Sequence, residues 1–297
     1  MRSLDVLVIG GAGVDTIVYV PELPLPYADS YLVPAIEQRA GQTGDGVALG
    51  LHALGLRVHL IDLIGDDHEG RLVRELHERH GVPFTAITSA AGTKRAVNLV
   101  DPAGRRLSLY DISRGVDDER FPIPVLGPLA ADARHVHLSI THPGAHAIDE
   151  LLGSGATLST DLHDWDGVDA YHEAFAYAAD LVFLSTTALD DHEAAMRRIL
   201  MRGRARAVIA TAGAEGAYLL TPDHPGVRHV PVAPLPAPAV DSNGAGDAFV
   251  AGFLFGWLGG ASAMASARYG AVAGAHACGV PAREIRPIGA AALTAAG

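Results

Sequence analysis

The stretch VDSNGAGDAFVAGFLFGWLGG, residues 240–260, places two aspartates, an asparagine and a Gly-Ala-Gly turn directly before a long apolar run. The apolar run predicts a buried helix, and Gly244, Ala245 and Gly246 form the turn into it. At a helix N-terminus the first amide N–H groups lack intrahelical acceptors and the helix dipole is positive, so small residues there let an anion approach. Asp247 lies beside this anion hole, where its carboxylate can accept a proton from a hydroxyl. The stretch therefore favours phosphoryl transfer.

Other interpretations of the glycine-rich turns are weighed against this one. A P-loop would need GxxxxGK[ST], which is absent, and Lys94 is the only lysine of the chain. A capped helix, in which Asp247 only interacts with the dipole, fits the spacing equally well. The GGAG sequence at residues 10–13 follows a strand, but a GxGxxG fingerprint requires glycine where Thr16 stands, so hydride transfer on NAD is not favoured.

Composition and charge limit the class of protein. The chain has 297 residues, enough for a substantial core, and a formal net charge of -12 from 34 acidic and 22 basic residues. This charge argues against nucleic acid as a partner. Cys278 is the only cysteine, so no internal disulfide can form, and the N-terminal apolar run is too interrupted for a signal peptide. We therefore expect a cytoplasmic protein.

One uncharged stretch, residues 248–267, is long enough to cross a bilayer as a helix. It contains four glycines, and Gly259 and Gly260 are placed to end one helix before another begins. Lysine and arginine do not flank its N-terminal side. We therefore expect two buried helices and no membrane span.

Short apolar runs alternate with helix-like stretches along most of the chain. Runs that end in glycine or polar residues are typical of strands buried on both faces. This alternation predicts an α/β fold in three layers, with a mostly parallel central sheet and ligands at the carboxyl ends of its strands. The expected strands are residues 4–10, 57–65, 134–140, 156–162, 180–185 and 207–213, and the helices between several of them are residues 46–54, 70–80 and 190–202.

Two segments do not follow the alternation. Residues 15–39 are rich in proline, and residues 93–111 read as strand, Asp-Pro-Ala-Gly turn and strand. We expect them to form a small antiparallel sheet outside the main one, a lid that lies over the strand ends and excludes water from a site.

These residues resemble the signatures of one family. DSNGAGD, residues 241–247, is similar to the C-terminal signature of the ribokinase-like, or PfkB, carbohydrate kinases, usually of the form DTxGAGD. GGAGVD at 10–15, AGQTGD at 40–45 and LIGDDHEGRLVRELHERHGV at 63–82 follow in the family's order. The resemblance covers essentially the whole chain. It implies one ribokinase-like kinase domain over residues 1–297, with lid segments at about 15–39 and 93–111 that cover the acceptor and often mediate dimerisation.

The resemblance also implies roles for the matched residues. Asp247 would be the base that takes the acceptor's proton, and residues 244–246 the anion hole. Asp15 would hold sugar hydroxyls, its alternative role being to cap the turn after the first strand. TAGAEG, residues 211–216, is similar to the family's TxGxxG, which lies against the nucleotide, and the helix at 266–279 to the one that lines the adenine pocket, although core packing also explains its alanines. The implied nucleotide-binding residues are Ser185, Thr211, Gly213, Gly216, Asn243, Ala271 and Ala275.

The chain departs from the family's pattern at the lid hinge and after one strand. The hinge usually has Gly-Gly and an asparagine four residues on, whereas this chain has Ala40-Gly41 and Asp45, which puts a carboxylate into the expected substrate pocket. The family commonly carries Asn-x-x-Glu, which organises magnesium, where this chain has Ser-Thr-Thr-Ala at residues 185–188. Ser185 can still donate to a phosphate, so we expect Mg²⁺ to be held by phosphates and water.

Two further groups of residues complete the predicted site. Asp161 and His163 lie at the end of a strand and are candidate substrate contacts, as is Gly41; the histidines around them lack the spacing of a metal site. Asp241 resembles the place where many family members hold a monovalent cation such as K⁺.

The main hypothesis is an ATP-dependent kinase that phosphorylates a primary hydroxyl of a sugar or sugar-like molecule. A nucleoside kinase of the same fold is one alternative, although the low aromatic content offers little material to stack a base. A sensor that binds sugar and nucleotide without turnover is the other. The apolar alternation in the lid segments predicts a homodimer through the lid. The sequence leaves the acceptor itself unnamed.

Overall fold

A computed structural model describes residues 2–114, 118–236, 239–240, 242–281 and 284–297. Its main sheet has the strand order β13-β12-β11-β10-β9-β8-β1-β4-β5, and all neighbours except β11–β12 and β12–β13 pair in parallel. The strands are β1 (Leu4–Ile9), β4 (Val58–Ile64), β5 (Phe84–Thr88), β8 (Ala133–Ser139), β9 (Thr157–Asp161), β10 (Leu181–Ser185), β11 (Ala207–Thr211), β12 (Ala217–Leu220) and β13 (Arg228–Val230). The expected mostly parallel α/β sheet is confirmed.

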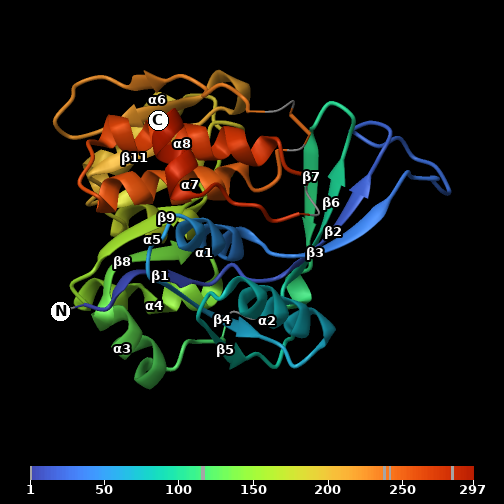
Figure 1. The fold of residues 1–297 in the computed structure, drawn as a ribbon, viewed down its shortest axis with the longest axis horizontal. Helices are drawn as coiled ribbons and strands as arrows, with labels where there is room; N and C mark the ends of the chain where they lie inside the picture. The colour runs from blue at the N-terminus through green and yellow to red at the C-terminus, as the bar shows by residue number, and fades with distance from the viewer. Residues whose placement is uncertain (1, 115–117, 237–238, 241, 282–283) are drawn as a thin grey trace.

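Helices cover both faces of this sheet, because its strands are apolar on both sides (Figure 1). One face packs on α1 (Thr43–Ala53), α2 (His68–His80), α7 (Ala245–Leu258), α8 (Ala263–Cys278) and α9 (Ala290–Ala296). The other packs on α3 (Ile123–Asp132), α4 (His142–Gly153), α5 (Ala170–Ala178) and α6 (His192–Arg202). Parallel strands bring their carboxyl ends to one edge, where the predicted site residues of β9, β10 and β11 gather.

A second sheet projects from one end of the molecule, on the side away from the N-terminus (Figure 1). Its order is β3-β2-β6-β7, formed by β2 (Val14–Tyr19), β3 (Ile36–Ala40), β6 (Arg95–Val100) and β7 (Arg106–Tyr110). The expectation of a purely antiparallel sheet was wrong, since β2 and β6 pair in parallel. β2 follows β1 and β6 follows β5 along the chain. Because β1 and β5 run in the same direction in the main sheet, β2 and β6 leave the same edge of that sheet in the same direction.

The stretch at residues 248–267 forms parts of two helices, as expected. α7 ends at Leu258, Gly260 has a left-handed φ of 86°, and the Ser262 side chain accepts a hydrogen bond from the Ala265 amide to cap α8. Within the part of the chain that the structure describes, no helix is long and apolar enough to span a membrane.

Candidate active site

The N-terminal turn of α7 supports the predicted anion hole. Gly244 caps the helix with φ 79°, a left-handed conformation that glycine adopts at little cost. The Ala245 amide donates to the Ser242 carbonyl (3.2 Å), and the first helical bond runs from the Ala248 amide to the Gly244 carbonyl (2.9 Å). The amides of Gly246 and Asp247 thus belong to the first turn, where helix geometry supplies no acceptor. Gly246 is exposed, and a Cβ built on it would meet no atom within 4 Å, so an anion can approach.

Asp247 packs against α1 at Gly46, a position that only glycine can occupy. A Cβ on Gly46 would lie 2.8 Å from Asp247 Oδ2 and 2.9 Å from its Cβ. Burial raises the pKa of Asp247 to about 6; the nearby Asp161 carboxylate raises it further, whereas His163, Arg39 and Arg106 act in the opposite direction. A carboxylate with this pKa is largely ionised at neutral pH and still basic enough to take a proton, which suits a general base.

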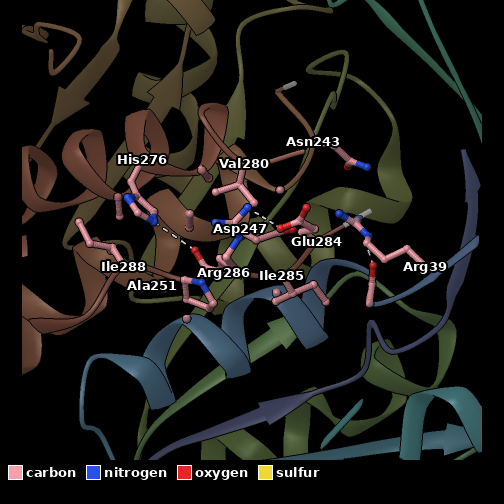
Figure 2. Close-up of a pocket in the computed structure, with 18 of the residues that line it drawn as sticks. Arg39, Asn243, Asp247, Ala251, His276, Val280, Glu284, Ile285, Arg286 and Ile288 are labelled. Carbon is pink, nitrogen blue, oxygen red and sulfur yellow. Dashed lines mark hydrogen bonds and ion pairs between the residues drawn. The ribbon is translucent and has the colours of Figure 1, made fainter. Parts of the chain in front are cut away.

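A cavity beside Asp247 explains part of this pKa shift. Figure 2 shows Asp247 and Ala251 of α7 in its wall, with His276 of α8 and Ile285 and Ile288 of the loop that follows α8. The His276 ring nitrogen is 3.1 Å from the Arg286 carbonyl, which holds this loop over the cavity. Since the wall is mostly apolar, it solvates the Asp247 carboxylate poorly.

On the acceptor side, Asp15 lies at the base of the lid. Its Oδ1 accepts a hydrogen bond from Gln42 Nε2 (2.9 Å), and its Oδ2 lies 3.4 Å from Arg39 Nη2. Burial raises the pKa of this carboxyl, and Gln42 and Arg39 counteract that effect. Gly41, between the two partners, has φ 124° and accepts from Arg39 through its carbonyl. Asp15 is thus held by two residues that the sequence analysis had not selected.

The structure corrects the position of Asp45, which was expected in the substrate pocket. Its side chain is fully buried at the third position of α1, where Oδ2 accepts from the amides of Gln42 (2.9 Å) and Gly13 (3.1 Å). Its Oδ1 lies 2.6 Å from His77 Nε2 on α2. The carboxylate therefore caps α1 and ties it to the turn after β1, because it reaches back to the N-cap amide as a capping box does.

Asp161 and His163 lie together at the end of β9. The His163 amide donates to Asp161 Oδ1 (2.8 Å), and the His163 carbonyl accepts from the Ser185 amide on β10 (2.6 Å). Both side chains are partly exposed, and both act on the pKa of Asp247. The structure therefore brings these two predicted residues to the predicted base.

The lid reaches the anion-hole loop through a contact that the sequence analysis missed. Arg106 Nη1 of β7 donates to Asn243 Oδ1 (2.9 Å), and Ser242 Oγ lies 3.5 Å from the Gly104 carbonyl. Strand register puts Arg106 on the same face of the lid as Asp15 and Asn98. The alternation of these polar residues can be seen in the sequence. The pairing of Arg106 with Asn243 cannot, because the two residues are far apart along the chain.

The predicted nucleotide-binding residues Ser185, Thr211, Gly213 and Gly216 gather at neighbouring strand ends. Ser185 pairs with Thr211 in the register of β10 and β11. Gly213 begins the short 3₁₀ helix η2 (Gly213–Glu215) and Gly216 follows it, with positive φ values of 55° and 93°. On α8, which packs against β12 and β13, Ala271 is half-buried, whereas Ala275 is buried in the protein. Ala271 also packs against the hydrophobic core.

The residues described here do not form a magnesium site of their own. Hydroxyls of Ser185 and Thr187 lie 2.8 Å apart at the end of β10, without a carboxylate beside them at Ala188. Over the described ranges, no group of three or more His, Cys, Asp or Glu side chains is arranged to hold a metal ion. Asp241, the predicted cation ligand, lies outside the described residues.

Comparison with known proteins defines the class. The model of the pfkB family of carbohydrate kinases matches residues 3–283, and the chain belongs to this family. It is thus an ATP-dependent carbohydrate kinase, an enzyme that phosphorylates an alcohol group.

One curated relative and two solved structures show how similar this chain is to individual proteins. The chain is 59% identical over 289 residues to the acarbose 7(IV)-phosphotransferase of Actinoplanes sp., covering 97% of each chain. A solved structure of a microbiome-derived acarbose kinase, Mak1, superposes with a TM-score of 0.91 at 44% identity, covering 99% of this chain and 98% of the other. The ribokinase of Thermotoga maritima, at 17% identity and a TM-score of 0.78 over 98% of each chain, shares the fold.

Proposed function

We propose that this protein transfers the γ-phosphoryl group of ATP to acarbose, at the hydroxyl of position 7 in unit IV. The observation that carries the choice of acceptor is the 59% identity, over 97% of both chains, to a phosphotransferase of that name. The site supports the chemistry, because it joins a base, an anion hole and a lid at one edge of the sheet. In this proposal residues 1–297 act as one kinase domain.

The residues act in a defined order in this mechanism. Asp247 takes the proton of the acceptor hydroxyl while the hydroxyl oxygen bonds to the γ-phosphorus. The bond from that phosphorus to the β–γ bridging oxygen breaks, and ADP leaves. The first-turn amides of α7 hold the phosphoryl oxygens as charge develops on them. Asp15, oriented by Gln42 and Arg39, accepts hydrogen bonds from acceptor hydroxyls.

The lid supports an acceptor larger than one sugar ring. Its inner face carries Asp15, Asn98, Ser108, Arg106 and Tyr110 in strand register. Asn98 and Ser108 are joined by a hydrogen bond of 2.7 Å, and Tyr110 presents a largely exposed ring, 68% accessible, at the end of the same row. Polar groups beside an exposed aromatic ring suit the hydroxyls and the apolar faces of linked rings.

The test is an acceptor panel with ATP and Mg²⁺. We expect acarbose to give a kcat/KM at least about tenfold above those of ribose, free glucose and adenosine, measured as ADP release, since 1.4 kcal/mol of extra transition-state binding gives that factor. Phosphorus–proton correlation spectra of the product should place the phosphate at position 7 of unit IV. A preference for adenosine would instead establish the nucleoside kinase, and binding of ATP and acarbose without consumption of either would establish the sensor.

A further inference from the structure

His163 lies where the acceptor and nucleotide halves of the site meet. The sheet order β8-β9-β10-β11 puts the end of β9 between the acceptor side and the strands whose ends carry Ser185 and Thr211. The hydrogen bond from the Ser185 amide to the His163 carbonyl, 2.6 Å, fixes His163 against the nucleotide side. The His163 amide donates to Asp161, which is predicted to contact the acceptor.

The backbone of His163 is held in an unfavourable conformation. Among the described residues other than glycine, it alone has a positive φ, 52°. Left-handed backbone costs free energy for a residue with a side chain, and such residues cluster at functional sites where the surroundings hold them. Here the Asp161 carboxylate and the Ser185 amide do so through the two hydrogen bonds described above. A turn needed only for the chain's path would be met more favourably by glycine or asparagine.

The side chain of His163 is only partly buried at the end of β9. Its Nδ1 is 3.9 Å from Asp161 Oδ2, too far for a hydrogen bond, and one third of the side chain is exposed. In its protonated form the imidazole lowers the pKa of Asp247, and this effect is larger than that of Arg39 or Arg106. The imidazole is therefore near enough to influence the pKa of the base, and part of it is open to solvent.

We propose that His163 is a catalytic residue whose ring N–H donates a hydrogen bond to the γ-phosphoryl group during transfer. This inference rests on the proposed phosphotransferase activity and adds a side-chain donor to the amides of α7. His163 keeps its proton throughout: the acceptor proton goes to Asp247, the new bond joins the acceptor oxygen to phosphorus, and the β–γ bridging oxygen leaves with ADP. The donor stabilises the charge on the phosphoryl oxygens.

The experiment uses His163→Asn, because asparagine tolerates the left-handed backbone and cannot supply the imidazole. The matched control is His224→Asn, in an exposed turn where the His224 ring lies 3.0 Å from the Gly226 carbonyl. We expect His163→Asn to lower kcat by about 10²- to 10³-fold, the loss typical of one preorganised oxyanion donor, with the KM for ATP and acarbose changed less than about threefold. The control should keep the parent kinetics. Thermal unfolding curves should show that both variants are folded at the assay temperature. The unfolding midpoint of His163→Asn should not be lower than that of the parent.

A second readout separates this proposal from the identity of the acceptor. ADP with aluminium fluoride mimics the phosphoryl group in transfer, so its affinity should fall in His163→Asn by about the same factor as kcat, while the affinity for ADP alone stays constant. This holds even if acarbose proves to be the wrong acceptor, and the rate of ATP hydrolysis without acceptor should fall in parallel. A folded His163→Asn variant with parent-like kcat, or with unchanged affinity for ADP–aluminium fluoride, overturns the proposal and leaves His163 a turn residue.

Discussion

Among single residues, Asp247 carries the first prediction. Asp247→Asn keeps the size of the side chain and the α7 turn but cannot accept the acceptor's proton. We expect kcat to fall by about 10²- to 10⁴-fold with little change in substrate affinity, measured by steady-state kinetics and calorimetry. If Asp247 only interacted with the helix dipole, the variant would keep nearly full turnover and lose roughly 0.3–1 kcal/mol of stability.

The raised pKa of Asp247 predicts that Asp247→Asn is more stable than the parent protein at high pH. The pKa of Asp247 is raised from 3.8 to about 6 in the folded state, so its stabilising contribution is complete below pH 3.8 and is lost as the pH rises through about 6. Each unit of pKa shift corresponds to about 1.4 kcal/mol, reduced here because the side chain is partly open to solvent. We expect the variant to gain about 1 kcal/mol or more in unfolding free energy at pH 8, measured with urea. A net loss at pH 8 would contradict this.

The same pKa predicts how activity depends on pH. Because the base must be ionised, kcat/KM should rise with pH through about 6 and level off above it, and a plot of its logarithm should have a slope near one on the acid side. Initial rates between pH 5 and 8 at constant ionic strength measure this. A profile flat down to pH 5 would show that another group, or none, acts as the base.

Among elements, the approach of α1 to α7 depends on glycines that face the catalytic helix. Gly46 contacts Asp247, and a Cβ on Gly50 would lie 2.8 Å from the Ala251 Cβ. Gly46→Ala must displace the Asp247 carboxylate, and misplacement of about 1 Å can cost about 10²-fold in rate, so we expect a kcat reduced to that extent. The control is Gly127→Ala in α3, where a Cβ would lie 3.2 Å from the flexible Glu150 side chain and 3.9 Å from Ile123 Cγ2. Unchanged kcat in Gly46→Ala would mean that α1 yields without moving the base.

At the scale of the whole molecule, the lid sheet is the surface from which we predict a homodimer. Its inner face carries the polar residues Asp15, Asn98, Ser108 and Arg106 beside buried Ile17 and Val100. Strand register gathers Val18, Ile36, Leu99, Leu107 and Leu109 on the outer face. Ile36 is 67% and Leu109 53% exposed. An apolar sheet face of this kind is commonly covered by a partner. We propose a homodimer through the outer faces of two lids.

The test of this dimer is light scattering at micromolar concentration. We expect the parent to have twice the chain mass and Leu109→Glu to be monomeric, because a charge in an apolar interface loses its water without a partner. Leu152→Glu, on the exposed side of α4, is the matched control and should stay dimeric. A monomeric parent at that concentration would remove the proposal.

Much of the fold was predictable because its signals are local. Apolar runs of strand length, helix-like stretches between them and the glycine turn before α7 each depend on neighbouring residues, and the strands and helices formed where these patterns stood. The pairing of β2 with β6 was not predictable in this way. It depends on where two distant segments leave the main sheet.

The features of the candidate site also fall into those set by local sequence and those set by contacts between distant segments. Sequence alone determined the α/β architecture, the turn at residues 244–246 and the placement of Asp247, since a helix start and its first-turn amides follow from local composition. Tertiary structure decided that Asp45 caps α1 against His77 and that Gln42 orients Asp15. It also decided that Arg106 joins the lid to Asn243, 137 positions along the chain, and that His163 influences the pKa of the base. These contacts depend on the packing of whole elements, so burial and partner geometry set them, whereas residue order does not.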